Sequence, residues 1–384
     1  MNRIFFGGLC ALSLTLGISR FTYTPLLPVM QQETFLGVAT GGILATIHYL
    51  GYFTGVLFAL KIDSLISREK FYFWGLFLAV VSTFMMGLAE NFFIWSIARF
   101  VAGFSGASGV VIGAGLIMQW LTENTNQKPQ MGKFFAGAGV GIVISAFGSI
   151  VFNILGLNWS KQWIFYGFIS CFLFIPAWFL RPKLKINKKV IHANENSTNK
   201  TKLPSGFFRL LLMYFFAGFA FVVSATFTVA IVKSNPENAS LGNAVWLLVG
   251  FTSIPSVLIW DWVEVKFSMN KALCFAITLH AISLLFNAFF VQLEFILIAA
   301  FLFGFSNLGV VSLTMTLAGR EAPKNPGKEM ARLTIAFALS LVIGPSIAGI
   351  LAEINGTYFY PLVLSSLLLI LGVILLLSRN KEIS

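Results

Sequence analysis

The sequence predicts an all-α membrane protein with about twelve spanning helices, and its composition gives the first support. Of the 384 residues, 57% are hydrophobic and only 10% are charged, and the mean hydropathy is +0.85. A soluble domain carries about 25% charged residues, because its surface faces water. The 42 Phe and 34 Gly also suit a lipid environment, since glycine is frequent in membrane helices and lets them approach closely.

Apolar runs set the number of predicted spans. About 20 residues are needed to cross a hydrocarbon layer of about 30 Å. The chain contains twelve such runs, at residues 4–30, 38–60, 71–89, 92–119, 132–156, 162–180, 207–232, 241–260, 271–290, 293–318, 331–353 and 359–378. The first run lacks a clear cleavage site and continues past a polar stretch at 20–25, so we interpret it as a retained helix and not as a signal peptide.

The net charge of +12 is explained by the distribution of the basic residues. With the N-terminus in the cytoplasm, 22 of the 26 Lys and Arg residues fall in cytoplasmic segments. This bias is the positive-inside pattern of membrane proteins. It predicts a multi-pass protein of the cell (inner) membrane with both termini in the cytoplasm. The charge therefore does not indicate a nucleic-acid partner.

The chain divides into two halves that resemble each other. Residues 181–206 are charged and Asn-rich, which is typical of a flexible linker. We therefore expect an N-terminal six-helix bundle at 1–180, a cytoplasmic linker, and a C-terminal bundle with a short tail at 207–384. Three motifs recur about 200 residues apart, which favours two parallel repeats with a solute site between them: Gly103-Phe104-Ser105 with Gly304-Phe305-Ser306, Gly132-Lys133 with Gly327-Lys328, and Asp63 with Asp261.

Two arginines within the predicted spans are the first candidates for substrate binding. Arg20 and Arg99 lie at similar depth, about 12 Å and 10 Å below the outer surface at 1.5 Å per residue. Buried arginines usually face the interior of a helix bundle, where they can bind an anionic group through two N–H donors. In the alternative interpretation each arginine pairs with Glu33, Glu90 or helix carbonyls and only holds helices together.

Other polar residues give weaker indications. His48 lies near the middle of the second span, and its near-neutral pKa suits a proton relay; the alternative is a hydrogen-bonded packing histidine. Tyr23, Thr24 and Asn307 are expected to line the cavity. The three cysteines lie singly in apolar runs without metal-ligand spacing, so we expect neither a metal nor a cofactor.

Prolines and glycines mark the spans that can bend or slide. Pro25 and Pro28 must distort the outer end of the first span, because proline lacks an N–H donor and clashes one turn back. Gly344 and Pro345 allow close packing and bending in the eleventh span. These positions, with Gly103 and Asp63, are our candidates for gating or packing, although close helix contact alone also explains glycines.

Several motifs resemble the major facilitator superfamily. Arg99-x-x-x-Gly103-x-x-Gly106-Ala107 resembles its arginine motif in helix 4. Asp63 with Arg68 and Lys70 resembles a degenerate form of the signature in its loop 2–3, without the glycines of that signature. Gly344-Pro345-x-x-x-Gly349 resembles the helix-5 Gly-Pro signature, but it falls in the eleventh span.

The YbfB-like branch of that superfamily gives the more specific resemblance, which covers essentially the whole chain. It is carried by the run from Gly17 to Pro28, by Tyr49-Leu50-Gly51-Tyr52, and by the segment from Phe303 to Pro323. The resemblance implies secondary transport by two rocking bundles, and it implies no particular substrate.

We therefore expect a monomeric secondary active transporter in the lipid bilayer, with a small organic anion as substrate and a proton as candidate coupling ion. The anion would be a carboxylate or a carboxylate-type metal chelator. Two alternatives remain open: efflux of drug-like apolar compounds through a Phe-lined cavity, and a non-transporting receptor of transporter ancestry. A membrane-embedded enzyme would need clustered His, Asp or Glu side chains, which the sequence does not offer.

Overall fold

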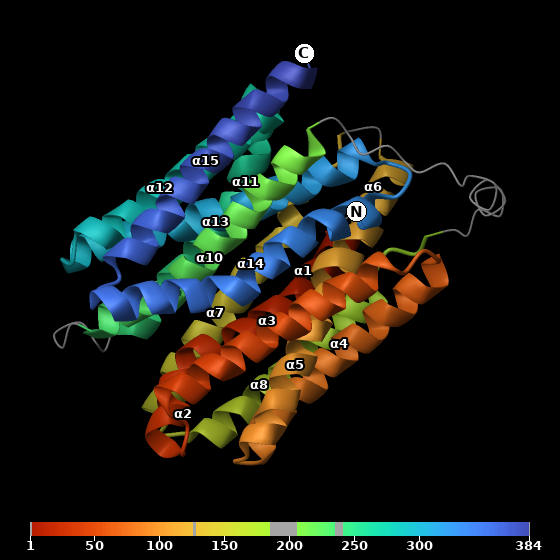
Figure 1. The fold of residues 1–384 in the computed structure, drawn as a ribbon. Coiled ribbons are helices and arrows are strands. Elements are labelled where there is room, and N and C mark those ends of the chain that lie inside the picture. Colours follow the sequence, from red (N-terminus) through yellow and green to blue (C-terminus); the bar gives the residue numbers. More distant parts are fainter. Residues whose placement is uncertain (1, 126–127, 185–205, 235–240, 384) are drawn as a thin grey trace.

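The computed structural model describes residues 2–125, 128–184, 206–234 and 241–383, which form helices and no strand. Within these ranges, twelve helical segments are long and apolar enough to cross a membrane, so the predicted fold class is confirmed. The start of the first helix and the end of the last lie on the same side of the molecule (Figure 1). We call this the termini side, and the opposite end the far side.

The first six spans contain two that are built from three helical segments each, with a π-helical segment in the middle. The first span is α1, η1 and α2, and the fourth is α5, η2 and α6. The bounds in this half are α1 (Asn2–Leu12), η1 (Ser13–Phe21), α2 (Tyr23–Glu33), α3 (Val38–Leu60), α4 (Leu65–Leu88), α5 (Phe92–Ala107), η2 (Ser108–Gly113), α6 (Ala114–Asn124), α7 (Gly132–Ile154) and α8 (Trp159–Phe179).

The last six spans are single helices, and they repeat the neighbour relationships of the first six. Contacts of α3 with α5, of α4 with α5 and of α4 with α8 have their equivalents in α11 with α13, α12 with α13 and α12 with α15. The bounds in this half are α10 (Phe207–Ser234), α11 (Gly242–Phe267), α12 (Met269–Phe289), α13 (Leu293–Glu321), α14 (Pro326–Asn355) and α15 (Phe359–Ile383).

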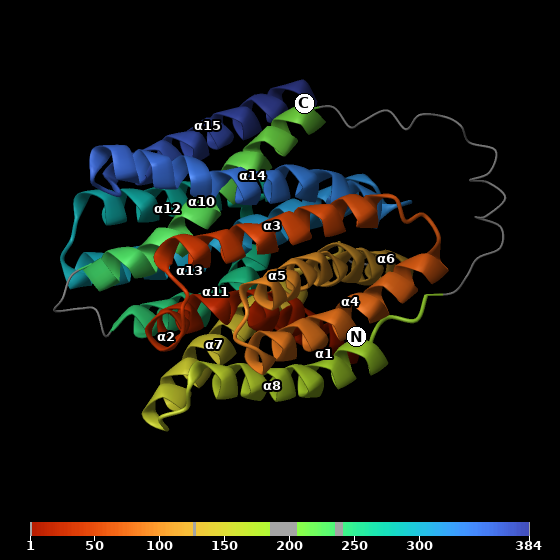
Figure 2. The ribbon, with the colours of Figure 1, turned by 60° about the horizontal axis from the view of Figure 1, so that its bottom comes forward.

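The two halves meet through two equivalent helix pairs. Helix α7 packs against α11, and α3 packs against α14; in Figure 2, α3 and α14 lie next to each other along the boundary between the halves. Exchanging the halves converts one pair into the other, as expected for parallel repeats. The exact division at the linker stays a prediction, and residues 185–205 of that linker lie outside the described part of the chain.

Several helices extend past their apolar runs on the termini side. Helix α4 begins at Leu65 instead of 71 and α14 at Pro326 instead of 331, while α6 ends at Asn124 and α11 at Phe267. Hydropathy marks only the part of a helix inside hydrocarbon, whereas the helical backbone continues in both directions as far as its capped ends. At α4 this cap is Ser64, whose hydroxyl accepts the N–H of Ser67 at 3.1 Å.

Candidate functional site

The π-helical segment η1 places Arg20 between the two halves. Pro25 has no N–H, so the carbonyl of Phe21, four residues earlier, lacks its usual helical partner. The π-helical segment ends at Phe21. Ordinary α-helical spacing then resumes, with Thr22 N bonded to Ile18 O at 3.4 Å and Leu26 N bonded to Thr22 O at 3.2 Å. Such π turns are frequent at functional sites. Pro28 lies inside α2.

Arg20 is buried, with 8% of its surface exposed, and its charge is surrounded by aromatic rings. The guanidinium carbon lies 5.0 Å from the ring centre of Phe21, 5.1 Å from that of Tyr49 and 4.8 Å from that of Phe221. Phe221 belongs to α10, so this contact crosses between the halves. Nε and Nη2 have no hydrogen-bond partner among the described residues.

Arg99 lies beside Arg20 and has a partner. Its Nη1 donates to the backbone carbonyl of Ser19 at 3.2 Å, and its guanidinium carbon lies 4.3 Å from the ring centre of Tyr23. The Tyr23 hydroxyl donates to the carbonyl of Gly41 at 2.8 Å. Arg99 therefore ties α5 to the π-helical segment, while its own Nε has no partner in the described chain.

Neither arginine forms an ion pair with a carboxylate within the described ranges. Glu33 instead accepts the backbone N–H of Trp159 at 2.7 Å. Among the described residues, the partner observed from the alternatives that the sequence left open is a helix carbonyl, that of Ser19, for Arg99.

The two intramembrane histidines differ in their surroundings. His48 is 2% exposed, and its ring lies 5.9 Å from that of Tyr49. Its Nδ1 has no partner among the residues that the structure describes. His280 instead shares a hydrogen bond of 3.1 Å with the hydroxyl of Ser224 and packs against Phe303. His48 therefore neighbours the arginine cluster, while His280 lies in the second half.

The remaining predicted site residues have no hydrogen bond to either arginine within the described chain, or they take packing roles. Thr24 is half-buried in α2, and Asn307 is buried in α13 without a hydrogen bond to either arginine.

Gly103 lets α5 approach α3, since a methyl group there would lie 1.9 Å from the carbonyl oxygen of His48. Gly344 similarly faces Val222 of α10 at 2.6 Å, and Pro345 lies inside α14.

The sequence did not single out the aromatic partners of Arg20. With 42 Phe in the chain, no spacing distinguishes Phe21 or Phe221 from residues that face lipid. Tyr49 appeared only as part of a family motif. The contact between Arg20 and Phe221 joins residues about 200 positions apart, so it requires the folded structure.

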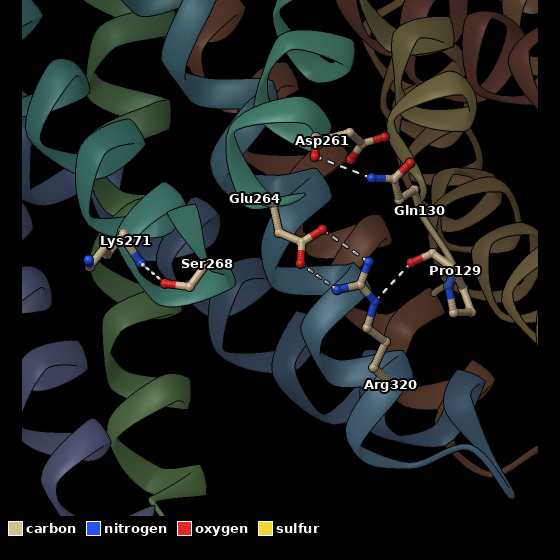
Figure 3. Close-up of polar contacts among 7 residues, drawn as sticks. All are labelled: Pro129, Gln130, Asp261, Glu264, Ser268, Lys271 and Arg320. Atoms are coloured by element: carbon tan, nitrogen blue, oxygen red, sulfur yellow. Dashed lines mark hydrogen bonds and ion pairs between the residues drawn. The ribbon is translucent and has the colours of Figure 1, made fainter. Parts of the chain in front are cut away.

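A polar network on the termini side joins the halves across α7 and α11. Arg320 donates to both oxygens of Glu264 at 2.9 and 3.2 Å, and its Nε donates to the carbonyl of Pro129 at 2.9 Å (Figure 3). Gln130 donates to the backbone carbonyl of Asp261 at 3.2 Å. The Asp261 carboxylate accepts the N–H of Gly132, the first residue of α7, at 2.9 Å.

The equivalent contact on the other side of the interface involves the predicted gating residue Asp63. Its carboxylate pairs with Lys328 of α14 at 3.2 Å. Nearby, Arg68 donates to the side-chain oxygen of Asn325 at 2.6 Å. The termini side is therefore held together at two places, both at polar helix ends that hydropathy had excluded from the spans.

An open cavity of about 620 Å³ lies at the far side of the second half, between α12, α14 and α15. None of the predicted site residues lines it, so we do not assign it to the site. Within the described residues, no three His, Cys, Asp or Glu side chains lie close enough together to hold a metal ion.

Twelve spans in two repeated halves, with a buried arginine cluster at their boundary, define a membrane transporter of the major facilitator type. The family profile described as "Uncharacterised MFS-type transporter YbfB" matches residues 12–377, and the chain belongs to this family. The predicted family is thereby confirmed.

Two relatives are similar over most of the chain. The "Uncharacterized MFS-type transporter YceJ" of Bacillus subtilis (strain 168) is 25% identical over 371 residues, which cover 92% of this chain and 90% of the relative. The "Probable sugar efflux transporter" of Helicobacter pylori (strain P12) is 22% identical over 305 residues, which cover 79% of this chain and 75% of the relative.

Proposed function

We propose that this transporter moves a small organic anion by secondary active transport, and that Arg20 binds the anionic group. The observation that carries the proposal is the unpartnered edge of the Arg20 guanidinium. Nε–H and the adjacent Nη2–H point in the same direction and match the two oxygens of a carboxylate. A carboxylate, or a chelator that binds metal through carboxylates, is the ligand that this edge fits best.

The energetics of burial support the same proposal. A buried cation without a partner is costly, so water or a bound anion must compensate it. The aromatic rings around Arg20 contact the guanidinium from Phe21, Tyr49 and Phe221, and such contacts stabilise the cation itself. They do not satisfy the N–H donors of its edge, which remain for the substrate.

Alternating access would require the contacts on the termini side to break and reform. The bonds of Arg320 to Pro129 and of Lys328 to Asp63 each join one half to the other. We propose that they hold this side closed while substrate exchanges at the far side. The positive-inside pattern supports a cytoplasmic termini side in the cell (inner) membrane, and we propose a monomer.

His48 is the proposed proton-coupling group. Its ring lies beside Tyr49, whose ring in turn contacts the Arg20 guanidinium. A charge change at His48 would therefore be felt at the anion site, because electrostatic interactions are strong in a poorly solvated interior.

Efflux of sugar-like or apolar compounds is the second candidate. It is favoured by the aromatic rings around Arg20 and by the name of the Helicobacter pylori relative. A receptor that does not transport would bind ligand without solute flux. We do not propose catalytic activity for this chain.

The test is a thermal-shift screen on purified protein with matched pairs of compounds, because a ligand of the folded state raises its apparent stability. Succinate with succinamide and benzoate with benzamide separate charge from shape, and simple sugars test the second candidate. We expect the carboxylates to stabilise the protein more than their amides. Flux of the best ligand into proteoliposomes then distinguishes a transporter from a receptor, and stabilisation by sugars alone would contradict the proposed substrate class.

A further inference from the structure

Three aromatic rings meet beside Arg20, and they come from both halves. Phe21 of the first half lies 6.4 Å from Phe221 of α10 and 5.8 Å from Trp246 of α11, in edge-to-face arrangements. The three side chains are at most 5% exposed. Because Phe21 immediately follows Arg20 in the chain, these rings adjoin the proposed anion site directly.

The Phe221 ring in the second half is packed among other aromatic rings. Phe221 packs against Phe303 at 6.1 Å and against Phe337 at 6.0 Å, and Phe337 in turn stacks on Tyr214 at 4.7 Å. Such a layer gives a fixed flat surface. Phe21, in contrast, belongs to the other half, so opening of the boundary between the halves at this point would separate it from Phe221 and Trp246.

Trp246 also carries a hydrogen-bond donor without a partner. Its side chain is 1% exposed, and its Nε1 bonds to no other group in the described chain. A buried indole N–H usually finds a partner, because leaving it unpaired costs free energy. The ring that packs against it is Phe21, whose side chain offers no hydrogen-bond acceptor, so a bound ligand is the natural acceptor.

We infer that the substrate carries a flat unsaturated ring between its anionic group and a second hydrogen-bond acceptor, and that Trp246 donates its indole N–H to that acceptor. The inference rests on the proposed function, because it takes the anionic group to lie at Arg20. When the halves separate, the ring of Phe21 loses its contacts with Phe221 and Trp246. A flat ring between them replaces those contacts, whereas a puckered saturated ring fits the same space poorly.

The experiment compares two probes by titration calorimetry on the purified full chain. The probes are 4-acetylbenzoate, which has an acceptor opposite its carboxylate, and 4-ethylbenzoate, which has a similar shape and no acceptor. One hydrogen bond predicts that wild type binds the acetyl compound about fivefold to tenfold more tightly. Trp246→Phe keeps the ring and removes the N–H, so this preference disappears while the affinity for 4-ethylbenzoate stays.

The matched control is Trp262→Phe on the same helix, since that side chain is 57% exposed and should leave the preference unchanged. The saturated analogue 4-acetylcyclohexanecarboxylate should bind at least about tenfold more weakly than 4-acetylbenzoate, because it cannot stack between the rings. Equal binding of the two aromatic probes by wild type, or a preference that survives in Trp246→Phe, overturns the inference.

The variant Arg20→Lys distinguishes a failure of this inference from a failure of the proposed function. If carboxylates without rings bind in an Arg20-dependent way and the aromatic probes do not bind, the inference is wrong and the proposed function stands. If the aromatic probes bind equally well to wild type and Arg20→Lys, the proposed anion site is wrong, and this inference fails with it.

Discussion

Arg99 donates from Nη1 to the carbonyl of Ser19 at 3.2 Å, so one buried arginine holds the backbone directly before the other, Arg20. The two arginines therefore have different expected roles. Arg20 contacts Phe221 of the other half, and its Nε and Nη2 have no hydrogen-bond partner among the described residues. Arg99 positions the π-helical turn that carries Arg20.

Substitution of Arg99 should affect both stability and binding. Lysine cannot reproduce the planar contact with Tyr23 together with the bond to Ser19. We expect Arg99→Lys to lower the melting temperature and to weaken anion binding, because Arg20 loses its support. Tyr23→Phe removes only the bond to Gly41 and keeps the ring under Arg99, so it should cost about 1 kcal/mol of stability with unchanged affinity. Loss of binding without loss of stability in Arg99→Lys would instead make Arg99 a direct ligand.

Gly103 tests the close approach of α5 to α3. An alanine methyl there would collide with the carbonyl of His48 at 1.9 Å, and overpacking of this kind costs about 1–3 kcal/mol or more. We expect Gly103→Ala to lower the melting temperature clearly. Gly42→Ala on α3 is the control, because nothing lies within 4 Å of that position. Equal melting temperatures of the two variants would refute the close contact.

Glu264 tests the closure of the termini side. Glu264→Gln weakens the hold on Arg320 and through it the bond to Pro129, so this side should open more often. Met118→Cys, placed in a variant without the native cysteines, reports opening through its rate of maleimide labelling. Met118 lies under Gly319 of the other half in the closed arrangement. We expect labelling to become about fivefold faster, which corresponds to about 1 kcal/mol, the typical contribution of one hydrogen bond.

Glu329→Gln is the control for this measurement, because Glu329 pairs with Arg332 inside the same helix and this ion pair does not link the two halves. Its labelling rate should match that of the parent protein. If the two glutamate variants label at the same rate, the network at Arg320 does not hold the halves together.

His48 tests coupling to protons. If transport is proton-driven, His48→Gln should abolish accumulation against a gradient and leave exchange of labelled for unlabelled substrate largely intact. His280→Gln serves as the comparison, since His280 is bonded to Ser224 in the second half. Undiminished accumulation in His48→Gln would remove this residue from the mechanism.

The sequence was informative where physics acts locally. Hydropathy located the spans. The helical rise of 1.5 Å per residue predicted that Arg20 and Arg99 lie at similar depth in the membrane, and in the structure they are neighbours. The sequence could not show that Arg99 bonds to the backbone carbonyl of Ser19, since every helix residue carries such a carbonyl. Nor could it find Phe221 or Trp246, because their roles depend on contacts between the halves. The polar helix extensions at Arg68 and Glu264 were missed because hydropathy detects the lipid-embedded part of a helix and not its whole length.

The role of Arg20 is tested most directly by measuring affinity and melting temperature on the same variants. The ligand is the carboxylate that stabilises wild type most in the screen, and the control is Arg379→Lys, a buried arginine that pairs with Glu321. We predict that Arg20→Lys binds this carboxylate about tenfold to a hundredfold more weakly at an almost unchanged melting temperature, whereas Arg379→Lys melts earlier and binds normally. An Arg20→Lys protein that melts earlier and binds the carboxylate with wild-type affinity would contradict the anion site.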